Sequence, residues 1–308
     1  MTDAIREATE FKAVYQTAGI YDAVLPPHYY SGAEDIDLIA RLLAEHYGPP
    51  RHQLSMAEFG CGTGRITGRL APYARRLVAI DSSPAMLGSF QERFPHAQTQ
   101  CLDTRQAVTQ MLDEGLAGAF DVVGAFWSLS YPLGECFEGL TADGVDPVPD
   151  GDGAHRQATQ FVRNLVRLVA DNGHLVVLLF DAETREQRLV TRAWETIAPS
   201  PRGGRSYTRH LLLGQLRAAE DRGEGWLTHT RRSGVAVAPS SDAAREWFNH
   251  VHFKNLSALV NDPEVQAAVA VFVDEHTKLS GEVILPSGVH LIDFHAARGP
   301  RHHLPRRR

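Results

Sequence analysis

Met56-Ala57-Glu58-Phe59-Gly60-Cys61-Gly62-Thr63-Gly64-Arg65 is the stretch that decides the fold. The mostly apolar residues 54–59 predict a short buried strand, and the pattern that begins at Ile66 predicts a helix. The three glycines between them can take positive φ and let the backbone approach a ligand closely. Free amides at the start of the new helix face the same space. The sequence therefore predicts a strand, a tight glycine turn and a helix around a ligand site.

An acidic residue, Asp81, ends the next predicted strand. A carboxylate at that position can accept hydrogen bonds from both hydroxyls of a ribose, as the acidic residue of dinucleotide folds does. The glycine spacing is GxGxG, however, and it lacks the helix-packing glycine of the GxGxxG pyrophosphate binders. The simplest alternative is a glycine-rich turn in some other α/β sheet.

The pattern Glu58-x-Gly60-x-Gly62-x-Gly64 resembles the first motif of class I S-adenosylmethionine-dependent methyltransferases, and Asp81 falls where that family places its ribose acid. The resemblance covers about residues 15–181. It implies an α/β fold with a Rossmann-like, seven-stranded, mostly parallel sheet and helices on both faces. It implies S-adenosylmethionine as the cofactor. The cofactor contacts that it implies fall on Tyr21, Glu58, Gly60, Cys61, Gly62, Gly64, Asp81, Ser82, Met86, Asp103, Thr104, Phe126 and Trp127.

Three of these residues also have ordinary structural explanations. Asp103 precedes a predicted helix at 105–114 and can be its N-cap, a role that is compatible with a contact to adenine. The side chain of Met86 is more simply explained as part of the core. Tyr21 is either an entry-segment residue near the methionine part of the cofactor or a packed aromatic.

Composition bounds the class of protein. The chain has 308 residues, 43% of them hydrophobic and 22% charged, which is typical of a soluble globular protein with a sizeable core. A net charge of −6 argues against general binding of nucleic acids or anionic membranes, apart from the terminal Arg306-Arg307-Arg308. Three cysteines without CxxC spacing favour a reducing, cytoplasmic location, and no signal peptide, membrane span or metal-binding motif is evident.

We expect five segments along the chain. They are an N-terminal helical lid (1–50), a cofactor-binding core (51–200), a substrate-side insertion with helices (201–278), a closing β-hairpin (279–298) and a basic tail (299–308). Within the insertion, 226–230 and 235–238 are predicted to be two short antiparallel strands, whereas 206–217 is ambiguous between strand and helix. The closing hairpin is predicted to turn at Pro286-Ser287-Gly288.

Residues 133–156 are rich in acids and glycines, and no lysine or arginine occurs before Arg156. One interpretation is a solvated surface loop. The other is an acidic mouth, after the fourth strand, that attracts a cationic substrate. The acids lack the spacing of a calcium-binding loop.

Methyl transfer is an in-line displacement. The protein mainly has to hold the nucleophile, the methyl carbon and the sulfur in line and away from water, and acid–base groups matter less. The end of the fourth strand, Phe126 to Pro132, lacks the proline boxes of adenine, glutamine and cytosine methylation and resembles enzymes of small metabolites. The candidate catalytic residues are Tyr131, which is best placed, and three histidines that could act as a base: His28, His250 and His252.

These observations predict a methyltransferase acting on a small molecule, with an amino or guanidino nitrogen of a natural product or amino sugar as the acceptor. The alternatives are a small-molecule O-methyltransferase, a protein that binds the cofactor without catalysis, and an enzyme that modifies RNA or protein. A cationic acceptor, no nucleic acid or membrane partner and a homodimer are the corresponding expectations for partners.

Overall fold

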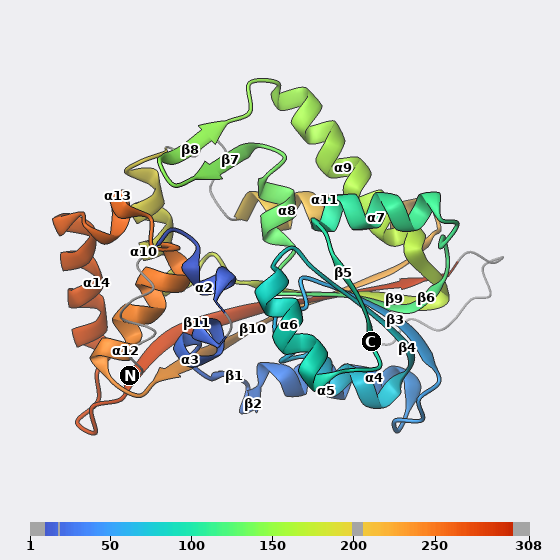
Figure 1. The fold of residues 1–308 in the computed structure, drawn as a ribbon, viewed down its shortest axis with the longest axis horizontal. Coiled ribbons are helices and arrows are strands. Elements are labelled where there is room, and N and C mark those ends of the chain that lie inside the picture. Colours follow the sequence, from blue (N-terminus) through green and yellow to red (C-terminus); the bar gives the residue numbers. More distant parts are fainter. Residues whose placement is uncertain (1–9, 18, 199–205, 298–308) are drawn as a thin grey trace.

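The computed structural model describes residues 10–17, 19–198 and 206–297. A nine-stranded sheet with the strand order β2-β1-β10-β11-β9-β6-β3-β4-β5 runs through this part of the chain (Figure 1). Its parallel half consists of β5 (Gln98–Cys101), β4 (Ala74–Asp81), β3 (Leu54–Phe59), β6 (Phe120–Phe126) and β9 (Val169–Phe180). Its antiparallel half consists of β11 (Val283–Ala296), β10 (Gly225–Ala238), β1 (His28–Tyr30) and β2 (Ala33–Glu34).

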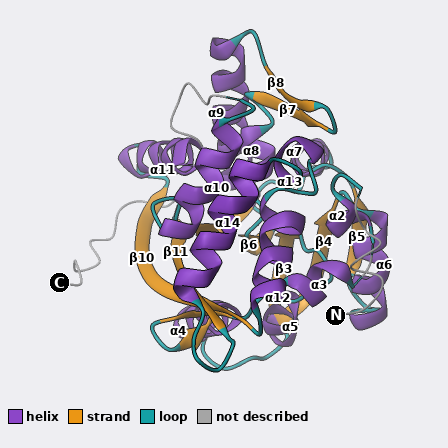
Figure 2. Ribbon diagram, turned by 90° about the vertical axis from the view of Figure 1, so that its left-hand side faces the viewer, coloured by secondary structure: helices purple, strands orange, loops and turns teal. Residues whose placement is uncertain are grey.

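Helices cover both faces of the sheet (Figures 1 and 2). One face packs against α4 (Asp35–Tyr47), α5 (Thr67–Leu70), the 3-10 turn η1 (Ala71–Tyr73) and α6 (Pro84–Arg93). The other packs against α7 (Thr104–Asp113), α8 (Ser130–Gly134), α9 (Gly151–Leu168) and α11 (Ser206–Asp221). Every residue of β3 is buried, as expected for a parallel strand covered on both sides.

A third apolar cluster forms a helical cap over the ends of β10 and β11. The cap contains α2 (Ala13–Gln16), α3 (Ile20–Val24), α10 (Arg185–Glu195), α12 (Ser241–Glu246), the π-helical turn η2 (Trp247–His252), α13 (Ser257–Val260) and α14 (Pro263–His276). From β3 the chain continues to β4 and β5 on one side, and it then crosses to β6 on the other side of β3. The carboxyl end of β3 is therefore the switch point, where ligands of such sheets bind.

The predicted α/β class and mostly parallel core are confirmed, but the count of seven strands was two too low. Strands β1 and β2 add to the sheet beside β10, in a segment that the sequence predicted to be a helical lid. His28 pairs with Ala236 there, so His28, Tyr29 and Tyr30 form a short strand that extends the antiparallel half of the sheet.

The predicted small insertion and closing hairpin were wrong. Strands β10 and β11 are each continuous and pair with one another along their whole length, from Gly225 opposite Ala296 to Ala238 opposite Val283. The glycines that suggested turns are positions of close approach: a Cβ at Gly234 would lie 2.1 Å from the Tyr29 carbonyl oxygen. The ambiguous segment 206–217 belongs to helix α11.

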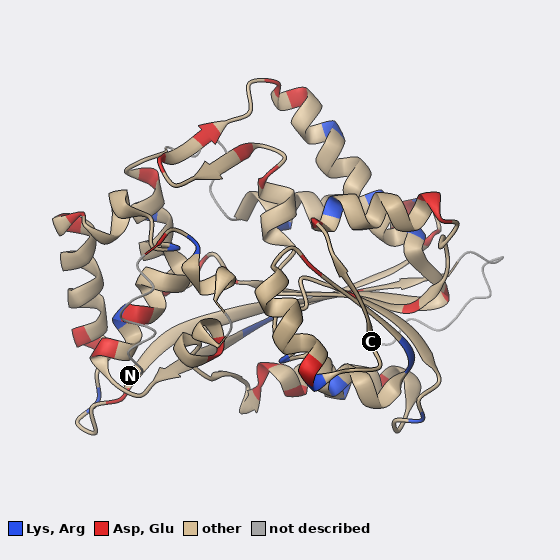
Figure 3. Cartoon of the chain, viewed as in Figure 1, with Lys and Arg blue, Asp and Glu red and all other residues tan. Residues whose placement is uncertain are grey.

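The acidic stretch is structured. It contains the antiparallel pair β7 (Glu138–Thr141) and β8 (Gly144–Pro147), followed by α9, whose N-cap Asp150 accepts a hydrogen bond from the Gly153 amide at 2.8 Å. The hairpin carries acidic and no basic side chains (Figure 3). It is therefore an ordered hairpin and not an irregular loop. The predicted basic tail, 299–308, lies outside the described residues.

Candidate active site

A cavity of about 280 Å³ opens at the carboxyl ends of β3, β4 and β6. All of the residues predicted to contact the cofactor line it, with the exception of Gly64. These lining residues are Tyr21, Glu58, Gly60, Cys61, Gly62, Asp81, Ser82, Met86, Asp103, Thr104, Phe126 and Trp127. Tyr131 lines the same cavity. We call this space the cofactor cavity.

The glycine turn brings β3 and the end of β6 into contact. Gly60 has φ +70°, and a Cβ there would lie 2.3 Å from the Cβ of Ser128. The Ser128 hydroxyl in turn donates to the Phe59 carbonyl oxygen at 2.6 Å. A side chain at position 60 would therefore push apart the two strands that form the floor of the cavity.

Gly64 has a packing role. It has φ +84° and does not line the cavity, and a Cβ there would lie 2.5 Å from the Phe94 ring. The structure thus corrects two expectations: Gly64 is not a cavity residue, and the GxGxG turn does contain a glycine that allows close packing, here of α6. The sequence missed this because Phe90 and Phe94 lie far along the chain from the turn.

Asp81 holds the turn with both of its carboxylate oxygens. One oxygen accepts from the Gly62 amide and the other from the Ser83 amide, each at 2.9 Å. Burial raises the pKa of Asp81, while these backbone hydrogen bonds oppose the rise. Each carboxylate oxygen has a second lone pair, so Asp81 can still accept two hydroxyls from a ligand. These two acceptor oxygens fit the hydroxyls of the ribose of S-adenosylmethionine.

Glu58 is a buried carboxyl group in the cavity wall. Thr67 donates a hydrogen bond to it at 2.5 Å. Burial, aided by the nearby charge of Asp81, raises the pKa of Glu58 to about 8. The group is therefore mostly protonated at neutral pH and would ionise readily beside a cation, which fits a cofactor that carries an ammonium and a sulfonium.

The affinity for S-adenosylmethionine is expected to increase as the pH rises from about 6 to about 7.5. Because the free Glu58 carboxyl has a pKa of about 8, it is protonated over that range, and a bound cation would favour its ionised form. Binding should therefore release a proton and strengthen by up to about tenfold per pH unit. Calorimetry in two buffers of different ionisation enthalpy measures that proton, and Glu58→Gln should remove it. An unchanged pH slope in Glu58→Gln would exclude Glu58 as its source.

An ion pair beneath the cavity was missed by the sequence analysis. Arg65 donates to both oxygens of Asp35, one of them at 2.7 Å, and the Trp127 indole N–H donates to Asp35 at 2.9 Å. Asp35 is 1% exposed. Burial raises its pKa, but the hydrogen bonds and charge of Arg65 outweigh that effect and hold the pKa below its ordinary value. Asp35 is thus an ionised group under the cavity wall.

Three non-glycine residues that line the cavity have left-handed backbone conformations: Lys12, Trp127 and Lys254. Trp127 has φ +63° and Lys254 has φ +54°, which are unusual values for bulky side chains. Lys254 follows the π-helical turn η2, and such turns are frequent at functional sites. The strained turn brings a lysine that is only 3% exposed to the cavity wall.

Lys254 meets a pair of tyrosines. Its Nζ lies 3.2 Å from the Tyr131 hydroxyl and 4.3 Å from the centre of that ring. The hydroxyls of Tyr131 and Tyr15 are 3.2 Å apart. Tyr15 belongs to α2, which is held close by a hydrogen bond of 2.5 Å from Ser83 to the Tyr15 carbonyl oxygen. No sequence motif marks Lys254 or Tyr15, because three distant segments meet here.

The three candidate histidines do not line the cavity. His28 Nδ1 donates to the Pro26 carbonyl oxygen (2.7 Å), and His28 lies behind the cavity wall, with its ring centre 6.2 Å from that of Trp127. His250 is bonded to Glu246 at 2.6 Å and His252 to Glu186 at 3.0 Å. Their placement corresponds to buried structural side chains, which leaves Tyr131 as the predicted catalytic candidate in the cavity.

The acidic stretch contributes one residue to the cavity, Glu135. Burial raises the pKa of this carboxyl, and Arg105 lies 3.8 Å from it. Two lysines, Lys12 and Lys254, line the same part of the site. Of the acidic stretch, Glu135 thus lines the cavity beside both acidic and basic side chains, because Asp103 is also near it.

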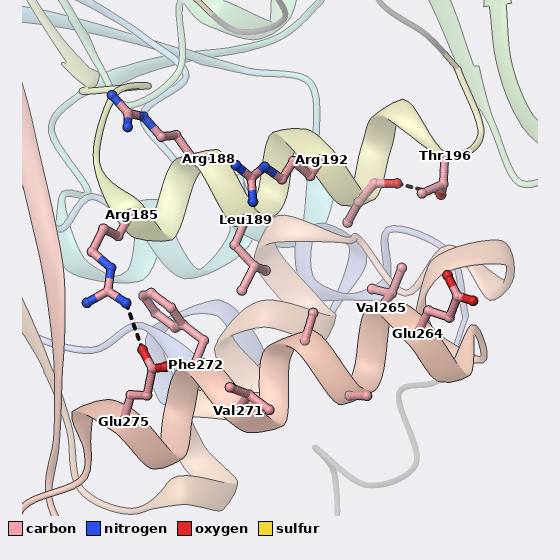
Figure 4. A pocket seen from close by; sticks show the side chains of 13 residues that line it. Arg185, Arg188, Leu189, Arg192, Thr196, Glu264, Val265, Val271, Phe272 and Glu275 are labelled. Atoms are coloured by element: carbon pink, nitrogen blue, oxygen red, sulfur yellow. Dashed lines mark hydrogen bonds and ion pairs between the residues drawn. The ribbon is translucent and has the colours of Figure 1, made fainter.

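A larger hollow of about 640 Å³ lies between α10 and α14 (Figure 4). It is an open groove with three arginines of α10 along one side, and Arg185 pairs with Glu275 at 2.7 Å. None of the predicted site residues lines it. Size therefore does not identify the site, whereas the converging glycine turn and buried carboxylates do.

Residues 57–175 match the family described as a methyltransferase domain. No curated protein matches the sequence. Among solved structures, the chain is similar to the YcgJ protein from Bacillus subtilis (12% identity over 86% of this chain and 98% of that one, TM-score 0.47). It is similar to a functionally unknown protein from Deinococcus radiodurans R1 (16% identity over 88% of this chain and 92% of that one, TM-score 0.46). It is also similar to the N-methyltransferase NodS from Bradyrhizobium japonicum WM9 (16% identity over 85% of this chain and 94% of that one, TM-score 0.41). At such scores these likenesses establish no function.

The matched domain contains the glycine turn, Asp81 and the carboxyl ends of β3, β4 and β6, which form the cofactor cavity. Residues 57–175 are therefore a methyltransferase domain, and the residues that line its cavity fit S-adenosylmethionine as the cofactor. In the described residues, no helix combines the length and the apolar character that crossing a membrane requires.

Proposed function

We propose that this enzyme methylates a hydroxyl oxygen of a small-molecule acceptor. The observation that carries the proposal is the group of Tyr131, Lys254 and Tyr15 in the same cavity as the glycine turn and Asp81. Hydroxyl and ammonium donors suit an oxygen that carries partial or full negative charge. The argument for an amine rested on the acidic stretch, of which only Glu135 reaches the cavity.

S-adenosylmethionine supplies the activated methyl group when bound. In the proposed site, Gly60, Gly62 and Asp81 hold the cofactor, and the strained Trp127 closes the floor against water. Tyr131 would orient the acceptor oxygen by a hydrogen bond, and the ammonium of Lys254 would favour loss of the hydroxyl proton to water. The ionised oxygen would then take the methyl group, and S-adenosylhomocysteine would leave. An ammonium acceptor would instead be repelled by Lys254 and would depend on Glu135 for pairing.

The Tyr131→Phe variant is expected to lower kcat/KM for the acceptor by about ten- to a hundredfold, because a hydrogen bond to a charged oxygen contributes about 1.5–3 kcal/mol. The affinity for S-adenosylhomocysteine should stay the same. Steady-state kinetics and calorimetry measure the two effects. Tyr29→Phe is the matched control, since Tyr29 lies 39% exposed on β1, outside the cavity lining.

A panel of phenols, alcohols, carboxylic acids and amines, read by mass spectrometry, distinguishes the candidate functions. Methylated phenols or alcohols support the proposal. Turnover confined to amines would replace it with the N-methyltransferase alternative, which Glu135 favours. Cofactor binding without any product would indicate a non-catalytic protein. The net charge of −6 counts against RNA as the acceptor.

A further inference from the structure

Three side chains from distant parts of the sequence meet near the ends of two central strands, β9 and β11, that lie away from the cofactor cavity. His46 lies in the last turn of α4, His174 in β9 and Asp293 in β11. In β9, His174 is the residue opposite His295 of β11. His46 Nε2 is 2.8 Å from one oxygen of Asp293, and His174 Nδ1 is 2.8 Å from the other. None of the three lines the cofactor cavity. We call them the His-His-Asp cluster.

The cluster is enclosed but reachable. The side chains of His174 and Asp293 are 5% and 7% exposed, whereas that of His46 is 27% exposed. The His46 and His174 rings are stacked with their centres 3.8 Å apart, and His295 stacks on the far side of His174 at 4.5 Å. One partly exposed ligand on a helix end gives an ion a route in, and the two buried groups would hold it away from bulk water.

We propose that the His-His-Asp cluster binds a divalent d-block cation of the zinc type. Two imidazole nitrogens and one carboxylate oxygen lie within 4.8 Å of one another. Imidazole with carboxylate is a ligand set that such ions accept, whereas magnesium and calcium prefer oxygen alone. A tetrahedral zinc ion with ligands at about 2.0–2.1 Å separates its ligand atoms by about 3.3 Å. Each histidine nitrogen lies 2.8 Å from an oxygen of Asp293, so each nitrogen–oxygen pair needs to move apart by about half an ångström.

The bound ion would link three elements that the polypeptide brings together only in the folded state. It would fasten the last turn of α4 to β9 and β11, while Asp35 in the first turn of the same helix anchors Arg65 under the cofactor cavity. The ion is thus a structural link at one end of α4, and the cofactor lies at the other. Zinc binding should raise Tm by about 5 °C at a hundredfold excess over Kd.

The test uses the untagged full chain, stripped with a chelator and titrated with zinc chloride or cobalt chloride. The expected result is one cobalt per chain with the visible absorption of tetrahedral cobalt, and a rise in Tm with zinc. His46→Ala should weaken binding at least a hundredfold while preserving the fold, because His46 is the exposed member on a helix end. Asp293→Asn should do the same or more.

Two controls address other histidines. His52→Ala changes an exposed histidine outside the cluster, and the double change His302→Ala and His303→Ala removes those near the end of the chain. Neither should alter the stoichiometry. Absence of saturable 1:1 binding, or binding that persists in His46→Ala, would overturn the proposal and leave a hydrogen-bonded cluster without a metal. The affinity for S-adenosylhomocysteine should be the same in the metal-free His46→Ala variant and the metal-free parent. Failure of the metal proposal would therefore leave cofactor binding intact, and failure of the proposed methyl-transfer function would leave metal binding intact.

Discussion

Replacing Asp81 with alanine is expected to weaken the binding of S-adenosylhomocysteine by about 3 kcal/mol, a factor of about 150. Both carboxylate oxygens face the end of the glycine turn, where each already accepts one backbone amide at 2.9 Å. The ribose hydroxyls would lose their acceptor, and the amides of Gly62 and Ser83 would lose theirs. Calorimetric titration measures the effect directly.

The control must separate ligand contact from damage to the turn. Asp81→Asn keeps the shape of the side chain and one acceptor oxygen, so its affinity for S-adenosylhomocysteine should lie between those of Asp81→Ala and the parent. Asp113→Ala, an exposed acid at the end of α7, should leave affinity unchanged. Thermal unfolding of each variant shows whether the turn still folds. An Asp81→Ala protein that is folded and binds with the parent's affinity would remove Asp81 from the cofactor site.

Asp35→Asn is expected to lower the free energy of unfolding by about 3 kcal/mol and to weaken cofactor binding as well. The change removes the charge that Arg65 pairs with, and Arg65 is only 26% exposed, so its guanidinium would be left with poor solvation. It also puts an amide N–H where the Trp127 indole N–H now donates. Trp127 holds an unfavourable backbone conformation at the cavity, so loosening its anchor should disturb the floor of the site.

Helix α4 supplies the matched control. Asp37 pairs with Arg69 at 3.0 Å, and both side chains are more than 40% exposed. Asp37→Asn should therefore cost no more than about 0.5 kcal/mol. Urea unfolding of the two variants measures the difference. Equal losses of stability would show that the Asp35 pair acts as an ordinary surface ion pair.

The parallel half of the sheet was predictable because its signals are local. The strand before Gly60, the acid at Asp81 and the helix cap at Ser83 are each indicated by the few residues around them, and backbone preferences and burial act on that scale. The antiparallel half was not predictable, since the turn-like glycines of β10 and β11 report close neighbours from other strands.

The cofactor side of the site followed from the same local patterns, whereas the acceptor side did not. Tyr15, Tyr131 and Lys254 come from α2, α8 and the turn after η2, and no spacing in the sequence relates them. For the three histidines, the residue type predicted a catalytic base. Packing and hydrogen bonds to Pro26, Glu246 and Glu186 instead place them outside the cavity.

By itself, the sequence determined the α/β class, the glycine turn with Asp81 at the end of the next strand, and S-adenosylmethionine as the cofactor. Each depends on residues that are neighbours in the chain or at the ends of adjacent parallel strands. Only the tertiary structure decided the nine-stranded sheet, the ion pair of Asp35 with Arg65, the lysine and tyrosines of the acceptor side, and the His-His-Asp cluster. Those features depend on contacts between residues as far apart as His46 and Asp293, which burial of the core brings together and no local pattern records.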